Sequence, residues 1–379
     1  MTRVEKNSPV LLLLLAAAFA PLAPPLAGQS EQVPFPRLVA TIDTGEDMPV
    51  VAAWSPDSER LAYGTEILVE RKRSPMAYGD EKFRRYYPGE VWLVTLAEME
   101  KKPKRILRYR FLRRVFGDFS YTVNAVSWSP DGSKLALELT NEKRESAVFF
   151  FTTKGKRIKL SRRSNFTFGY GGAWLADNES YAMLHESVKP RLLHQIGVLR
   201  SVAGRTVALF RYRSFVAVAW LAKKQQVVAA ERDRDFADPP QLILGDLKTG
   251  KAEVLAEVAD YLGGLQAAPD ENRVSYFVGQ DTLAVRELTP DAEVATFPVP
   301  LGRYQWAPTS DAIFFLQPAK LAGRTGRLLR LHLGDPEPRK VLDDTLHNFW
   351  LAPDGRHVAV LTAGLEPKLK IYRLGTSSQ

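Results

Sequence analysis

The sequence predicts an all-β fold built from seven copies of one antiparallel unit. Three observations support this prediction. A Trp-Ser-Pro-Asp turn recurs along the chain in complete or altered form, each copy follows an apolar run, and an alternating strand comes after most copies. Repeats of roughly 40–45 residues with four strands each are typical of β-propellers, whose strands form blades around an axis. We therefore expect a seven-bladed β-propeller of four-stranded antiparallel blades.

The position aligned with Trp54 marks each unit. The seven copies are WSPD at 54, WSPD at 128, WLAD at 174, WLAK at 220, AAPD at 267, WAPT at 306 and LAPD at 351. Successive copies are 74, 46, 46, 47, 39 and 45 residues apart, by subtraction of these positions. All spacings but the first fit a blade of four strands.

Each unit is expected to contain four strands in order. The apolar run before the turn, such as residues 123–128, is the first strand. In the turn, Pro presets φ, Asp accepts hydrogen bonds from nearby amides, and Gly takes a positive φ. The second strand alternates, as in residues 134–139. A third strand follows, such as residues 241–247, and a short turn leads to the fourth, within residues 246–258.

The two ends of the repeat region supply strands that fit together. After residues 357–362 the chain has one more strand, 368–375, and then four residues, so the last blade lacks its outer strand. Residues 37–43 form a spare strand before the first unit. We expect this N-terminal strand to pair with residues 368–375, because that pairing closes the last blade and covers two exposed edges.

The turn motifs resemble those of the TolB-like family of β-propellers, relatives of the WD-repeat fold. The family pattern W-S-P-D-G-x-x-[LI]-[AV] is matched best by residues 128–136 and 54–62, and the resemblance covers roughly residues 36–375. It implies the fold, and it implies no particular function, because one fold hosts unrelated roles. The namesake of the family has six blades behind a separate α/β domain. We therefore carry over neither its role nor its partners.

The first residues are typical of an export signal. Arg3 and Lys6 precede the apolar run 10–20, and a segment rich in Pro and small residues follows. Such a run is too short to span a bilayer comfortably, and its flanks are those of a signal peptide. We expect cleavage of residues 1–28, which leaves 29–379 as a single periplasmic or secreted propeller domain. An uncleaved N-terminal anchor is the alternative.

Composition limits the classes of function. The 379 residues contain no Cys, which excludes thiol catalysis and thiolate metal sites. The net charge is +9, but because the chain carries an export signal we expect no nucleic-acid partner. No second long apolar run follows the first. We therefore expect no integral membrane span in the mature chain, and we expect a monomer.

The sequence lacks the common motifs of catalysis. Its five His form no H-x-x-x-H pair, and it has no G-x-S-x-G elbow and no Walker A loop. Asp57, Asp131, Asp270 and Asp354 share one turn position and are expected to cap the turn, with calcium ligation as the alternative. We expect no enzyme, no catalytic residue, no cofactor and no metal. A propeller hydrolase or lyase that acts on a polymer in the axial cleft is the alternative function.

The first unit carries a basic insertion at about residues 67–120, with 14 Lys and Arg against 7 Asp and Glu. In a meander, the long loop after the second strand lies on the face opposite the Ser-Pro-Asp-Gly turns. Loops on a rigid scaffold often carry function, and interfaces favour Arg and Tyr. The expected binding residues are Arg71, Lys72, Arg73, Tyr78, Arg84, Arg85, Tyr86 and Tyr87.

These observations predict a non-catalytic scaffold of the cell envelope that binds a protein or peptide. Because the insertion is basic, an anionic partner is among those expected. For the basic insertion itself, two alternatives to a docking surface remain open. One is a solvated loop on a basic protein, and the other is a lid over the substrate of an enzyme.

Overall fold

The structure is built from antiparallel β-strands, as the repeated turns predict. The computed structural model describes residues 36–44, 48–71, 83–107, 121–141, 146–158, 167–168, 170–186, 194–200, 205–232, 238–318, 326–363 and 367–375. In these ranges the only helical element is a 3₁₀ turn at Leu96–Glu98, and no helix is long and apolar enough to cross a membrane. Residues 35–379 group as one compact unit. The expected signal peptide, residues 1–28, lies outside the described residues.

Four of the sheets contain four strands each, hydrogen-bonded in chain order. The first consists of β2 (Met48–Trp54), β3 (Arg60–Arg71), β4 (Phe83–Thr95) and β5 (Lys104–Leu107). The others are β11 (Tyr170–Trp174), β12 (Ser180–Glu186), β13 (His194–Arg200) and β14 (Arg205–Arg213); β15 (Phe215–Leu221), β16 (Gln226–Glu231), β17 (Gln241–Asp246) and β18 (Ala252–Glu257); and β19 (Tyr261–Ala267), β20 (Arg273–Val278), β21 (Leu283–Glu287) and β22 (Val294–Phe297). In each, the recurring turn joins the first two strands.

The sheet that follows β2–β5 has a divided outer edge. It contains β6 (Tyr121–Trp128), β7 (Lys134–Asn141) and β8 (Ser146–Thr152). Two short strands, β9 (Arg157–Ile158) and β10 (Thr167–Phe168), both pair with β8.

The last sheet has seven strands because one strand serves two units. Its order is β1 (Arg37–Ile42), β28 (Leu369–Arg373), β27 (His357–Thr362), β26 (Arg339–Leu351), β25 (Gly326–His332), β24 (Ala312–Pro318) and β23 (Tyr304–Trp306). The first part of β26 pairs with β25 and its second part pairs with β27, the two pairings meeting at Leu346. Thus β26 is the fourth strand of the sixth unit and the first strand of the seventh.

The N-terminal strand closes the last sheet as predicted. β1 pairs with β28 in antiparallel register, from Arg37 opposite Arg373 to Ile42 opposite Leu369. Ile42 is buried in a core that also contains Leu369 and Ile371. Burial of this apolar side chain gives the strand a stabilising role beyond its backbone hydrogen bonds.

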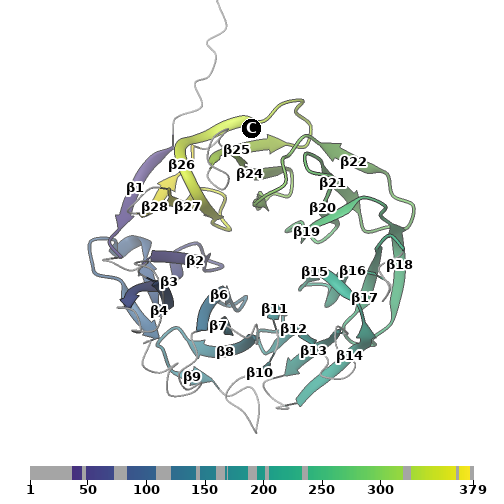
Figure 1. Cartoon of the computed structure of the whole chain (residues 1–379), viewed down its shortest axis with the longest axis horizontal. Helices are drawn as coiled ribbons and strands as arrows, with labels where there is room; N and C mark the ends of the chain where they lie inside the picture. The colour runs from purple at the N-terminus through teal and green to yellow at the C-terminus, as the bar shows by residue number, and fades with distance from the viewer. Residues whose placement is uncertain are drawn as a thin grey trace, which may run out of the picture. The chain divides into compact units, whose positions relative to one another are not determined.

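Consecutive sheets share buried cores. The sheet β2–β5 packs with β6–β8, and strands β7–β8 also pack with β11–β12. The third sheet packs with β15–β17 in the same way. Strands β19–β21 pack with β15–β17 on one side and with β23–β25 on the other. Figure 1 lets the strands be followed in this order by colour. The last sheet returns to the first, because Trp350 and Leu361 pack with Trp54 and Tyr63. The aligned Trp of the first two units is buried, since Trp54 is 6% exposed and Trp128 is 8% exposed.

Candidate functional site

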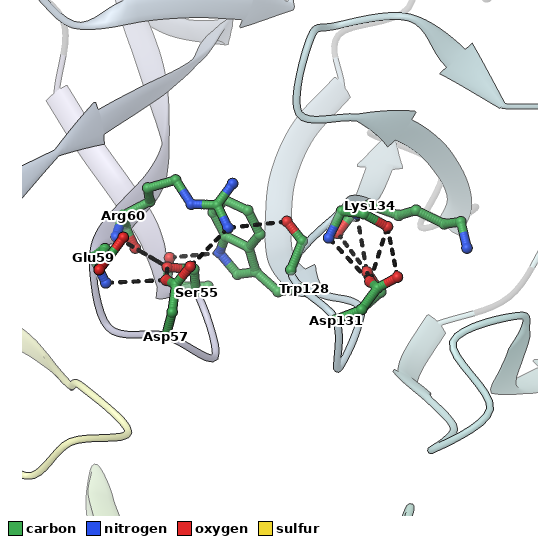
Figure 2. A network of polar contacts seen from close by, with 11 residues as sticks. Ser55, Asp57, Glu59, Arg60, Trp128, Asp131 and Lys134 are labelled. Atoms are coloured by element: carbon green, nitrogen blue, oxygen red, sulfur yellow. Dashed lines mark hydrogen bonds and ion pairs between the residues drawn. The ribbon is translucent and has the colours of Figure 1, made fainter.

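The repeated Ser-Pro-Asp turn is a hydrogen-bonded cap, as predicted. The Ser55 hydroxyl donates to the Asp57 carboxylate, and the Glu59 amide donates to the same carboxylate at 3.0 Å. The Arg60 amide donates to the Ser55 hydroxyl at 2.9 Å. Burial opposes ionisation of Asp57, but these hydrogen bonds and the Arg60 charge outweigh it and lower the pKa of Asp57. The second copy repeats the arrangement around Asp131 (Figure 2).

A basic residue six positions after the aligned Trp ties the first unit to the second. The Arg60 guanidinium donates to Asp57 Oδ2 at 3.0 Å and to the Gly132 carbonyl oxygen at 3.1 Å. It also lies over the Trp128 ring, with 4.9 Å between the guanidinium carbon and the ring centroid. Figure 2 shows Arg60 between its own turn and Trp128. Arg60 therefore joins two units through a hydrogen bond and a cation–π contact, while its ion pair with Asp57 lies within its own turn.

The same position works in the same way at two other junctions. Lys134 donates to the Asn178 carbonyl oxygen at 2.8 Å, and its Nζ lies 6.0 Å from the Trp174 ring centroid. Arg273 donates to the Ser310 carbonyl oxygen at 2.6 Å. Its guanidinium carbon lies 5.6 Å from the Trp306 ring centroid. In these three units, the strand that follows the turn begins with a cation that contacts the neighbouring unit.

The junction of the last unit with the first uses a histidine at this position. His357 Nδ1 lies 2.9 Å from Asp354 Oδ2, and the His357 ring is 6.1 Å from the Trp54 ring, centroid to centroid. The Asp354 amide donates to the Ser58 hydroxyl at 2.8 Å. Trp54 Nε1 donates to the Trp350 carbonyl oxygen at 2.9 Å. His357 is therefore a structural residue of the repeat.

A buried carboxylate lies between the second and third units. Glu138 is 8% exposed, and its Oε2 accepts a hydrogen bond from the Gly171 amide at 2.6 Å. Burial raises the pKa of Glu138, and the amide hydrogen bond offsets only part of that rise. Burial and the nearby Glu138 together raise the pKa of Tyr181. In the part of the chain that the structure describes, no three His, Asp or Glu side chains gather as a metal site.

The expected binding surface falls largely on a β-hairpin. The prediction of an irregular loop after the second strand is wrong for residues 83–90, because these continue β4 and pair with β3. Five of the eight predicted binding residues are placed there: Arg71 ends β3, and Arg84, Arg85, Tyr86 and Tyr87 lie on β4 opposite Glu70, Val69, Leu68 and Ile67. Lys72, Arg73 and Tyr78 lie outside the described residues.

No family model matches the chain, and no curated protein matches it. The resemblance to TolB-like propellers therefore rests on the turn motifs alone, chiefly those at Trp54 and Trp128.

Proposed function

We propose that the chain is an exported, TolB-like, seven-bladed β-propeller that acts as a non-catalytic scaffold and binds a protein or peptide of the cell envelope. Three features support the architecture. Seven turns join the first two strands of seven antiparallel units, β26 serves the sixth and seventh units in turn, and the last unit packs against the first. The basic, apolar leader at residues 1–28 supports export.

The long hairpin of the first unit carries the binding proposal. β3 has 12 residues, whereas the second strands of the other units have six to eight. β2 pairs with β3 as far as Glu66, and the rest of β3 continues in pairing with β4 alone within the described ranges. A two-stranded ribbon is marginally stable in water by itself. A bound partner would stabilise this extension, which the repeat itself does not need.

The composition of the hairpin and its surroundings favours an anionic partner. β4 carries the run Arg84-Arg85-Tyr86-Tyr87, and interfaces are enriched in both residue types. Residues 67–120 hold seven more basic than acidic residues, from 14 and 7. Clustered charge of one sign speeds association with a partner of opposite charge, over a Debye length of about 8 Å at physiological salt.

Replacement of Arg84 and Arg85 by Ser tests this function. The double variant should melt at nearly the temperature of the wild type but capture less of its partner from an envelope fraction, most clearly at low salt. The matched control replaces Lys248 and Lys251, exposed in the turn between β17 and β18, by Ser. Capture of the same partners with the same salt profile by both double variants would show that the hairpin is not the docking element.

A further inference from the structure

One position on or directly before the first strand stays accessible in every unit. It is the third residue before the aligned position, and in the seven units it holds Val51, Ala125, Gly171, Ala217, Gly264, Arg303 and Asn348. The structure describes all seven residues, and none of them is buried. Six are small, apolar or amide residues, so Arg303 is the single charge in this set.

Part of the space in front of these strands is open. A Cβ built on Gly171 or on Gly263 would meet no other atom within 4 Å, whereas a Cβ built on Gly264 would lie 2.7 Å from Phe277 Cδ2. Val216 and His347, one residue earlier in the fourth and seventh units, are exposed as well. The small residues therefore leave room for a bound chain beside the one arginine.

Arg303 is held in place from two directions. Its carbonyl oxygen accepts a hydrogen bond from the Leu316 amide at 3.2 Å, which anchors the backbone. Its guanidinium carbon lies 5.3 Å from the ring centroid of Trp350, a residue that is only 6% exposed. Because a guanidinium that lies over an aromatic ring keeps its N–H groups in the guanidinium plane, its donors remain available to a ligand.

Arg303 differs from Arg60 and Arg273, whose guanidinium groups have acidic partners. Arg60 pairs with Asp57 and Arg273 pairs with Asp270. Within the described part of the chain, no carboxylate forms an ion pair with Arg303. Surrounding protein atoms disfavour its charge and lower the pKa of Arg303 to about 10, so it stays protonated at neutral pH. An anion bound there would offset this cost.

We infer that Arg303 binds a carboxylate of an acidic peptide that lies along the accessible side of the first strands. The planar guanidinium can donate two parallel hydrogen bonds to a carboxylate, which a lysine cannot reproduce. The peptide nature of the ligand rests on the proposed scaffold function. The position is separate in sequence from the β3–β4 hairpin, so each can be removed without the other.

Fluorescence anisotropy with a dye-labelled pentaglutamate peptide, at constant ionic strength, tests the inference. The wild type should bind this probe saturably and should not bind labelled pentaglutamine. Arg303→Gln should weaken binding of pentaglutamate about tenfold or more, as expected for loss of a charge-assisted hydrogen bond. Arg303→Lys should give an intermediate loss. The matched control is Arg356→Gln, which removes an exposed arginine from a turn and should change binding less than about twofold.

Three results would overturn the inference. The first is absence of saturable binding by the wild type, and the second is equal binding by the wild type and Arg303→Gln. The third is competition by inorganic phosphate that is as effective as competition by unlabelled pentaglutamate, because the site would then have no preference for a carboxylate. If Arg303→Gln does not fold, Arg303→Lys and the pentaglutamine probe decide. The Arg84→Ser, Arg85→Ser variant separates the two proposals, because it should keep pentaglutamate binding if Arg303 is the site. Loss of binding in that variant alone assigns the carboxylate to the hairpin.

Discussion

The His357 imidazole packs against the Trp54 indole, with the ring centroids 6.1 Å apart. This contact joins the last repeat to the first, and it occupies the place that Arg60, Lys134 and Arg273 take at other junctions. One sequence position thus links units along the chain and also links its two ends. It acts beside the pairing of β1 with β28, which also ties the start of the chain to the last sheet.

Loss of the His357 side chain should destabilise the protein. His357→Ala removes the contact with Trp54 and the hydrogen bond to Asp354, and should lower the free energy of unfolding by roughly 1–2 kcal/mol. His357→Lys should retain much of it, because Lys134 fills the same role at another junction. Urea unfolding measures both. His347→Ala, at an exposed position, is the control, and a cost no larger than that of the control would count against this role.

The aligned Trp should be among the most costly residues to remove. Trp128 is buried in the core shared by the first two sheets, and its Nε1 donates to the Ala53 carbonyl oxygen at 2.9 Å. Trp128→Ala should therefore lower the free energy of unfolding by about 3–5 kcal/mol. Trp128→Phe keeps most of the apolar contact and should cost less. A loss below about 1 kcal/mol for the Ala variant, measured by chemical denaturation, would contradict this account.

The N-terminal strand should matter more than the C-terminal residues. Deletion of residues 31–44 removes β1, exposes the edge of β28 and uncovers the apolar core around Ile42. Removal of residues 376–379 leaves every described strand intact. The first deletion should lower the melting temperature far more than the second. Equal melting temperatures in a thermal scan would show that β1 does not stabilise the last sheet.

Glu138 should make stability depend on pH. Its pKa is raised in the folded state, so the folded protein holds this proton more tightly than the unfolded chain. Stability is therefore full below the unfolded pKa and falls as the pH rises through the folded pKa. The Glu138→Gln variant has no carboxyl to ionise at this site, so it does not lose this stability as the pH rises. It should be more stable than the wild type near pH 7, and the difference should vanish toward about pH 3, where the carboxyl is protonated in both states.

Melting curves of the wild type and Glu138→Gln across this pH range provide the measurement. Two neighbours of Glu138 affect the interpretation, since the Gly171 amide donates to it and Tyr181 lies close to it. Tyr181 stays neutral throughout because its own pKa is raised. Glu253→Gln, at an exposed site on β18, is the control. Parallel curves for the wild type and Glu138→Gln would mean that Glu138 does not titrate in this range.

The sequence predicted the features that depend on local chemistry. The cap around Asp57 follows from Ser, Pro and Asp in one turn, and pairing of β1 with β28 follows from counting strands. The position of Arg60 over Trp128 could not be predicted, because it depends on how two units pack. The sequence nevertheless contains a sign of this contact, because several copies have a basic residue six positions after the residue aligned with Trp54.

The hairpin and the buried acid were missed for different reasons. The spacing of 74 residues between the first two repeats suggested a long loop, although Tyr86 and Tyr87 favour strands. Glu138 lies on an alternating strand, where a single acid is expected to face solvent. It is buried because the neighbouring unit covers that face of the strand, with the Gly171 amide against its carboxylate. Strand pairing within one unit decided the first outcome, and a contact between two units decided the second.

The continuous strand β26 has a consequence for how the protein opens. Its amides belong to two hydrogen-bonded ladders, one with β25 and one with β27, and the ladders meet at Leu346. Local unfolding that releases one ladder must disturb the residues that begin the other. The last two repeats should therefore form a single cooperative opening unit in native-state hydrogen exchange, with a shared protection level, whereas the repeats joined by loops can open one at a time.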